Sequence, residues 1–205
     1  MKRLDRSEAA TALFDGEVIA VPTDTVYGVA ARWSDAEGVA RLFSVKSRPL
    51  DVALPVLVGS LEQVMAMDVR WAASAGALAT VFWPGALTIV VGAERAVATR
   101  IGATDSLGLR WPRHDLLEDL IIECGPLAVT SANEHGEPPC TSVEDVSAVA
   151  WGARVAGVLD GGRCDAPVSS VVEVHARGWR LRRLGAVGRA EIGAVLGPES
   201  EADDD

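Results

Sequence analysis

The order of apolar and polar positions along the 205 residues predicts short strands interspersed with helices. Short apolar runs closed by Pro, Gly or Asp are typical of buried strands. Such runs occupy residues 18–21, 54–58, 87–91, 107–111, 127–130, 155–159, 170–174 and 179–183. Helical patterns lie at 7–14, 71–82, 114–123, 142–150 and 190–196.

Two further helices are indicated by their start signals. Ser34 is followed three residues later by Glu37, and Ser60 by Gln63, each ahead of an apolar periodic stretch. This spacing lets two side chains satisfy backbone N–H groups at a helix N-terminus. Because the strands are unevenly spaced, we expect an α/β (α+β) fold with one twisted sheet of parallel and antiparallel pairs.

The chain shows no internal repeat and no Pro/Gly/Ser linker that would divide it, so we expect a single domain over residues 1–196. Five of the last seven residues are acidic, which favours a solvated, disordered tail over 197–205. The formal charge of the whole chain is −10. This charge disfavours autonomous nucleic-acid binding, because such binding depends on neutralising phosphates.

The sequence indicates a cytoplasmic protein. No apolar run approaches the roughly 18 residues that a membrane span needs, and the N-terminus lacks the apolar region of a signal peptide. Cys124, Cys140 and Cys164 form no CxxC pair or zinc-like cluster, so we expect reduced thiols.

Motifs of several enzyme classes are absent from the sequence. It contains no GxxxxGK[ST], GxGxxG, HExxH or GxSxG. Their absence argues against a P-loop NTPase, a dinucleotide enzyme, a zincin and an α/β-hydrolase.

Polar clusters instead follow the predicted strands, where open α/β sheets bind their ligands. Alone, each cluster can be a turn, a helix end or a surface ion pair. Together, Lys46, Arg48, Arg110 and Arg183 predict a positive site for a polyanion such as a triphosphate. Lys46 stands out because Lys2 is the only other lysine among 19 basic residues. Hydrogen-bonding groups for this pocket would come from Thr25, Ser131, Asn133, Thr141 and Ser169.

In this order, the clusters resemble the YrdC-like family of threonylcarbamoyl-AMP synthases. The matching segments are PTDTVYG (22–28), KSRP (46–49), FWPGALTIVV (82–91), GLRWPRH (108–114), GPLAVTSAN (125–133), LDGG (159–162), SSVVEV (169–174) and RRLGAV (182–187). The resemblance implies a YrdC-like mixed sheet with flanking helices around a deep cavity. It also implies ATP-dependent formation of L-threonylcarbamoyl-adenylate from L-threonine and bicarbonate, with release of pyrophosphate.

The resemblance further implies roles for individual residues. Lys46 and Arg48 would be the catalytic cations. L-Threonine would be bound by Thr25, Arg110, Ser131 and Ser169. ATP would be bound by Arg48, Ser106, Asn133, Thr141 and Arg183.

The implied cofactor and partners follow from the same likeness. Mg²⁺ would arrive with ATP, without a dedicated metal site on the protein. The product would pass to a tRNA threonylcarbamoyltransferase, which modifies the adenosine just 3′ of the anticodon. The chain itself would bind tRNA weakly or not at all.

The sequence departs from the family pattern at several positions. Val52 stands where the family often has Asn, and Leu57 where it can have His. After the SxN motif the family usually has Ser-Gly with another Ser nearby, whereas this chain has His135-Gly136 followed by Pro138-Pro139. These changes leave open an alternative, a non-catalytic RNA- or ribosome-associated paralogue with the same fold. A third interpretation, an adenylating enzyme of hydrogenase maturation, is disfavoured because the sequence lacks the acylphosphatase and zinc-finger domains expected of it.

Overall fold

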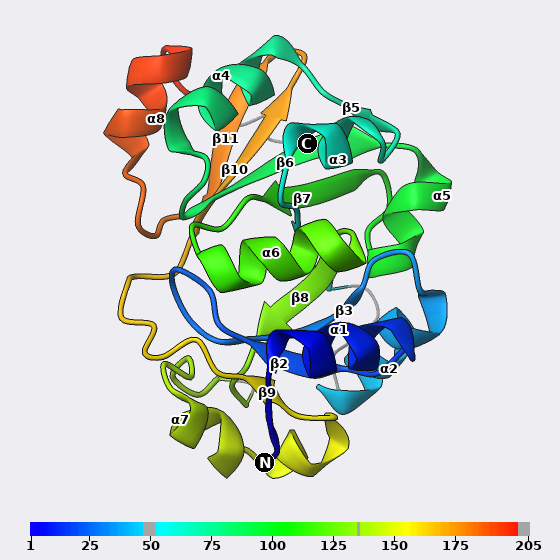
Figure 1. Ribbon diagram of the computed structural model, residues 1–205. Coiled ribbons are helices and arrows are strands. Elements are labelled where there is room, and N and C mark those ends of the chain that lie inside the picture. Colours follow the sequence, from blue (N-terminus) through cyan, green and yellow to red (C-terminus); the bar gives the residue numbers. More distant parts are fainter. Residues whose placement is uncertain (47–51, 135, 201–205) are drawn as a thin grey trace.

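The computed structural model describes residues 1–46, 52–134 and 136–200, which form one twisted sheet with helices packed against it (Figure 1). The strands are β1 (Arg3–Leu4), β2 (Ile19–Val21), β3 (Gly28–Arg32), β4 (Val56–Leu57), β5 (Val69–Arg70), β6 (Leu87–Ala93), β7 (Ser106–Arg110), β8 (Leu127–Ser131), β9 (Val158–Leu159), β10 (Ser170–His175) and β11 (Gly178–Arg183). Their order is β1-β9-β2-β3-β8-β4-β7-β6-β10-β11, and β5 pairs with β6. β3/β8 and β6/β7 are antiparallel, whereas β4/β7 and β6/β10 are parallel. The mixed sheet expected from the sequence is therefore confirmed.

Seven of the eight helices in the described residues fall close to the predicted ranges, and α5 was not predicted. The helices are α1 (Arg6–Phe14), α2 (Ala36–Val45), α3 (Leu61–Met65), α4 (Ala73–Phe82), α5 (Arg95–Ala98), α6 (Asp115–Cys124), α7 (Val143–Ala148) and α8 (Arg189–Leu196), with 3₁₀ turns η1 (Thr99–Ile101) and η2 (Ala150–Arg154). The predicted cap at Ser60 is confirmed, since its hydroxyl accepts from the backbone N–H of Gln63. The predicted cap at Ser34 is wrong by one residue. The carboxylate of Asp35 accepts the first N–H groups of α2 instead, and a carboxylate is favoured there by the helix dipole.

β3 is the main element that the sequence pattern did not predict. Its run GVAAR begins with glycine and ends with arginine, so it lacks the continuous apolar pattern of the other strands. It pairs with β2 on one side and β8 on the other, and Gly28 lies opposite Ser131. A Cβ on Gly28 would lie 2.5 Å from a methyl carbon of Val129, so only glycine permits this approach. This pairing brings the segments PTDTVYG and TSAN together.

Alternation along the strands separates two packing environments. On β2, Ile19 packs in a cluster with α1 and α6, whereas Ala20 belongs to the larger cluster that includes α2 and α4. On β7, Leu107 and Leu109 are fully buried in the larger cluster. Successive side chains of a strand point to opposite faces, so the remaining β7 side chains lie on the other face. Those side chains are the ones that build the cavity described below.

The C-terminal end of the described chain differs from expectation. Residues 197–200 were expected to belong to a solvated tail, but they pack against the open edge of β11. The carboxylate of Glu199 accepts from the N–H of Leu181 at 2.7 Å, and the hydroxyl of Ser200 accepts from the N–H of Trp179 at 3.0 Å. The outward N–H groups of an edge strand need partners, and these two side chains supply them. Residues 201–205 lie outside the described residues.

Candidate functional site

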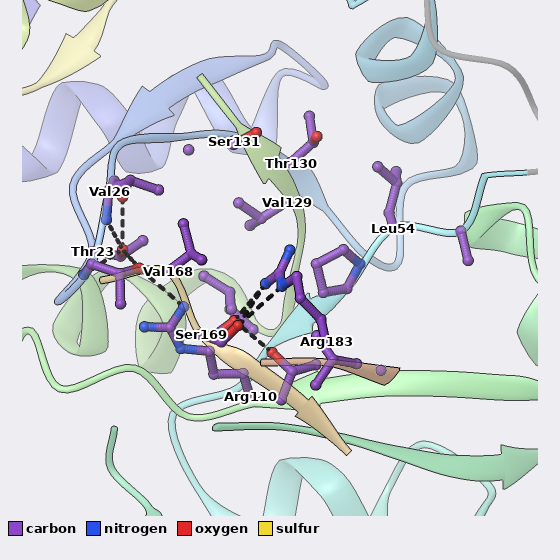
Figure 2. A pocket seen from close by; sticks show the side chains of 18 of the residues that line it. Thr23, Val26, Leu54, Arg110, Val129, Thr130, Ser131, Val168, Ser169 and Arg183 are labelled. Atoms are coloured by element: carbon purple, nitrogen blue, oxygen red, sulfur yellow. Dashed lines mark hydrogen bonds between the residues drawn. The ribbon is translucent and has the colours of Figure 1, made fainter. Parts of the chain in front are cut away.

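A cavity of about 520 Å³ opens beside β6, β7, β8 and β10 (Figure 2). Its wall includes alternate positions of these strands, both polar and apolar, such as Thr88, Gly108 and Val171. These positions share one face because Val90 pairs with Gly108 and Thr88 with Val171. Of the residues assigned from the sequence, the cavity is lined by Thr25, Ser106, Arg110, Ser131, Ser169 and Arg183.

Arg110 is the most deeply buried cation of this wall, with 6% of its surface exposed. Its Nε donates to the carbonyl of Gly85 at 3.0 Å, and one terminal nitrogen donates to the hydroxyl of Thr25 at 3.2 Å. The other terminal nitrogen forms an ion pair with Asp24. Burial lowers the pKa of Arg110, and the nearby Asp24 opposes that shift. The guanidinium stays charged, because an arginine pKa starts far above neutrality.

Two turns hold Arg110 in this position. The hydroxyl of Thr23 accepts from the N–H groups of Thr25 and Val26, both at 3.1 Å, and so folds the segment after β2. The segment before β6 is fixed to the end of β7, because the N–H of Gly85 donates to the carbonyl of Trp111 at 2.8 Å. The segments PTDTVYG, FWPG and GLRWP thus meet around one guanidinium.

Arg183 forms the second cation of the cavity. Its guanidinium donates to the carbonyl and the hydroxyl of Ser169, at 2.8–3.1 Å, as Figure 2 shows. The hydroxyl of Ser169 is also 3.1 Å from that of Thr88. Desolvation lowers the pKa of Arg183, and its charge further lowers the pKa of Arg110. Two cations that repel each other across one cavity favour an anionic ligand between them.

A tight turn after β11 places Arg183 against Ser169. The hydroxyl of Ser170 accepts from the N–H of Gly185 at 2.8 Å and donates to the carbonyl of Val187 at 2.6 Å. A Cβ on Gly185 would lie 2.2 Å from the carbonyl oxygen of Val168. Glycine is therefore required for this close backbone approach.

Lys46 and Asn133 come together in a neighbouring corner rather than on the wall of the cavity. The Lys46 ammonium donates to the Asn133 carbonyl and lies 4.8 Å from the centre of the Trp151 ring. The Asn133 amide donates to the carbonyls of Glu134 and Glu137. Its side-chain oxygen is buried and has no hydrogen-bond partner among the described residues, so it remains available to a ligand donor.

Other predicted residues are placed differently. The hydroxyl of Thr141 donates to Asp145 at 3.1 Å as part of the N-terminal cap of α7, and Thr141 does not line the cavity. Arg48 and His135 lie outside the described residues. Leu57 and Pro139, two of the departures from the family pattern, do line the cavity.

Tyr27 lies in the PTDTVYG segment, but the sequence predicted no role for it. It is fully buried, and its hydroxyl donates to the carbonyl of Gly162 at 2.7 Å and accepts from the N–H of Gly161 at 3.3 Å. Desolvation raises the pKa of Tyr27 to about 12. The side chain therefore ties the segment before β3 to the LDGG segment. Thr88 was also missed, and its only sequence signal is a hydroxyl at an alternate position within an aliphatic strand.

Two general features of the described chain bear on cofactors and location. Within residues 1–46, 52–134 and 136–200, no three His, Cys, Asp or Glu side chains gather as a metal site. None of the helices in these ranges is both long and apolar enough to cross a membrane.

Comparison with known proteins gives a consistent set of relatives. The Sua5/YciO/YrdC family model, described as "Telomere recombination", matches residues 11–185. A putative threonylcarbamoyl-AMP synthase of Mycobacterium tuberculosis (strain H37Rv) is 36% identical over 194 residues, covering 94% of this chain and 89% of that protein. Threonylcarbamoyl-AMP synthase of Bacillus subtilis is also 36% identical, covering 94% of this chain and 56% of its own length.

Solved structures agree with these sequence matches. The crystal structure of P. abyssi Sua5 complexed with L-threonine superposes with a TM-score of 0.88 at 32% identity, over 96% of this chain and 59% of that one. E. coli YciO superposes with a TM-score of 0.77 at 18% identity, which supports the fold alone. The mixed sheet with flanking helices is thus shared with both structures.

Proposed function

The chain belongs to the Sua5/YciO/YrdC family, and from that premise we propose that it is a threonylcarbamoyl-AMP synthase. In this reaction the amine of L-threonine and bicarbonate give a carbamate. An oxygen of the carbamate attacks the α-phosphorus of ATP, and the bond to the leaving pyrophosphate breaks. The products are threonylcarbamoyl-adenylate, pyrophosphate and water.

The observation that carries the proposal is the pair of arginines that face one cavity. Both the carbamate and the triphosphate are anions, so bringing them together is opposed by repulsion. Arg110 and Arg183 lower that cost without any movement, since protein hydrogen bonds already hold both guanidinium groups. A cavity that also keeps water out protects a carbamate and an adenylate, both of which hydrolyse.

We assign the threonine carboxylate to Arg110. A guanidinium has five N–H donors, of which three donate to Gly85, Thr25 and Asp24; among the described residues 5 − 3 leaves two for a carboxylate. Ser131 and Ser169 lie on the same cavity and supply hydroxyl groups for the rest of the amino acid. The P. abyssi structure with L-threonine supports a threonine site in this fold.

We assign the nucleotide to the side of the cavity that faces Lys46. Arg183 and Ser106 would bind phosphate and nucleoside groups from the wall, and the unpaired Asn133 oxygen would accept from the nucleotide. Lys46, together with Arg48 from outside the described residues, would neutralise the triphosphate. Mg²⁺ would be held by phosphate oxygens and water, which suits its preference for keeping water ligands.

The wider context follows from this chemistry. We propose that the adenylate passes to a tRNA threonylcarbamoyltransferase, that the protein acts in the cytoplasm, and that it binds tRNA weakly or not at all. The formal charge of −10 supports the last point. We further propose that the chain forms one domain, which the described contacts of Glu199 and Ser200 extend to residue 200.

The proposal is tested by incubating the protein with Mg²⁺, ATP and bicarbonate, with and without L-threonine, and following pyrophosphate and adenylate by chromatography. We expect product only with threonine and bicarbonate, and loss of product in Lys46→Ala. Lys2→Ala is the matched control, because Lys2 is the other lysine of the chain and forms an exposed ion pair with Glu8. Binding of ATP and threonine without turnover, or salt-dependent RNA binding with no turnover, would favour the non-catalytic paralogue.

A further inference from the structure

Three separate elements meet at the ammonium group of Lys46. Lys46 caps the C-terminus of α2, Asn133 follows β8, and Trp151 lies in η2. The ammonium donates to the Asn133 carbonyl and lies 4.8 Å from the centre of the Trp151 ring. The N–H of Ala150 donates to the carboxylate of Glu134 at 3.0 Å, which ties η2 to the same loop that carries Asn133.

The identity of residue 151 is informative. Trp151 is only 4% exposed, yet its indole nitrogen has no hydrogen-bond partner within the described residues. A buried N–H without a partner is unfavourable, so an aliphatic side chain would fill this position with less penalty. The face of tryptophan, however, is the strongest of the aromatic partners for a cation. The contact with Lys46 accounts for a ring at this position.

We propose that Trp151 is a positioning residue for Lys46. The inference rests on the proposed function, in which Lys46 neutralises the triphosphate. A lysine carries its charge on a flexible four-carbon stem, so the position of the ammonium depends on the groups that contact it. The Trp151 ring restrains it from a second direction. The ammonium is then already ordered when ATP arrives, so less ordering is needed in the transition state.

The first test compares Trp151→Leu with Trp151→Phe. We expect kcat for adenylate formation to fall about tenfold in Trp151→Leu, the scale of a partly desolvated cation–π contact, and to stay within about threefold in Trp151→Phe. The KM for threonine should be unchanged in both, because Trp151 does not line the cavity that holds Arg110. A wild-type kcat in Trp151→Leu would overturn the proposal.

A second measurement is independent of turnover. Tryptophan fluorescence responds to a nearby cation, so Lys46→Ala should change the emission of the wild-type protein but not that of a Trp151→Phe protein. An equal change of emission in the wild-type and Trp151→Phe proteins would show that Lys46 does not contact Trp151, and would overturn the proposal. If the protein formed no adenylate at all, the proposed function would fail, while this measurement would still decide whether Trp151 holds Lys46.

Trp33→Leu is the matched control. Trp33 is 7% exposed and also lies beneath a cation, with the Arg100 guanidinium 5.6 Å from its ring, but it follows the far end of β3. We expect it to lower the melting temperature, as Trp151→Leu does, and to leave kcat unchanged. An equal fall of kcat in Trp33→Leu would show that the loss reflects destabilisation alone and would overturn the positioning role.

Discussion

Arg110 has several hydrogen-bonding partners in the protein, whereas a surface arginine can be satisfied by water. It is almost fully buried and is fixed by a carbonyl, a hydroxyl and a carboxylate. Breaking such a set leaves buried partners unpaired, which costs more than the loss of an exposed ion pair. The directed N–H donors of the Arg110 guanidinium, rather than its charge alone, therefore determine how this part of the cavity wall is arranged.

We expect Arg110→Lys to raise the KM for L-threonine by about tenfold or more, because lysine keeps the charge but cannot reproduce the three directed contacts. Titration calorimetry with L-threonine measures the same loss without turnover. Arg113→Lys is the control, since Arg113 is exposed and donates to the carbonyl of Pro84. Equal threonine affinity in Arg110→Lys and the wild type would contradict the assignment.

Tyr27 predicts a dependence of stability on alkaline pH. Its pKa is raised from 10.0 to about 12, so the folded protein keeps a proton that the unfolded chain loses between these values. Its contribution is complete below pH 10 and is lost as the pH rises through 12. We expect the free energy of unfolding to fall over this range, and to fall less steeply in Tyr27→Phe.

Urea unfolding at several alkaline pH values measures this difference. The buried thiols of Cys124 and Cys140 also have pKa values raised to about 11, so both proteins lose stability in this range. The comparison with Tyr27→Phe isolates the tyrosine. Parallel pH profiles for the two proteins would contradict a buried, hydrogen-bonded phenol.

At the residue scale, the sequence predicted much of the site but not its arrangement. Arg110, Ser169 and Arg183 were assigned from motifs, and the structure brings them to one cavity. Thr141 was assigned in the same way, but its hydroxyl donates to the Asp145 carboxylate beside the Ser142 cap of α7, because a Thr-Ser-x-x-Asp run can satisfy a helix end by local contacts. Trp151 gave no signal at all, since its partner lies more than a hundred residues away in the chain.

At the element scale, short turns rather than strands set the positions of the functional groups. The turn after β11 is the clearest case, because Ser170 binds both of its ends and Arg183 lies at its start. The sequence predicted the strands around it from their apolar runs. It could not predict which turn residues touch a distant backbone, since that depends on how the strands pair.

Gly185→Ala tests this turn. The added Cβ would lie 2.2 Å from the Val168 carbonyl oxygen, so the backbone must shift. We expect a loss of about 2 kcal/mol in the free energy of unfolding, together with lower activity as Arg183 moves from Ser169.

Gly76→Ala is its control within a helix. Gly76 lies in α4, and its added Cβ would meet no atom closer than the Trp71 indole nitrogen at 3.7 Å. Alanine should raise the free energy of unfolding by about 0.5–1 kcal/mol, because it is the better helix former. Chemical unfolding measures both variants, and an equally stable Gly185→Ala would contradict the close approach.

At the scale of the whole molecule, the sequence predicted the fold class because local signals agreed with one another. Most strands and helices were visible as apolar runs and caps. β3 was not visible in this way, because its run begins with glycine and ends with arginine. It is buried through pairing with β2 and β8, which the local sequence does not indicate. The packing of Glu199 on β11 was also invisible, since acidic residues near a chain end are typical of solvated segments.

The overall charge leads to a prediction about RNA. With a formal charge of −10, the protein lacks the general attraction to phosphates that supports binding to nucleic acid. We expect fluorescence anisotropy with labelled tRNA to give a dissociation constant weaker than about 10 µM at physiological salt. Tight, salt-sensitive binding would instead favour the RNA-associated alternative.

The most direct test of the proposed synthase activity supplies ¹³C-bicarbonate together with ATP, Mg²⁺ and L-threonine, and analyses the adenylate by mass spectrometry. We predict threonylcarbamoyl-adenylate that carries one labelled carbon, in the carbamoyl group. An unlabelled threonyl-adenylate would show that the cavity activates the amino-acid carboxylate itself, and would contradict the assignment of that carboxylate to Arg110. Absence of any threonine-containing adenylate would contradict the synthase altogether.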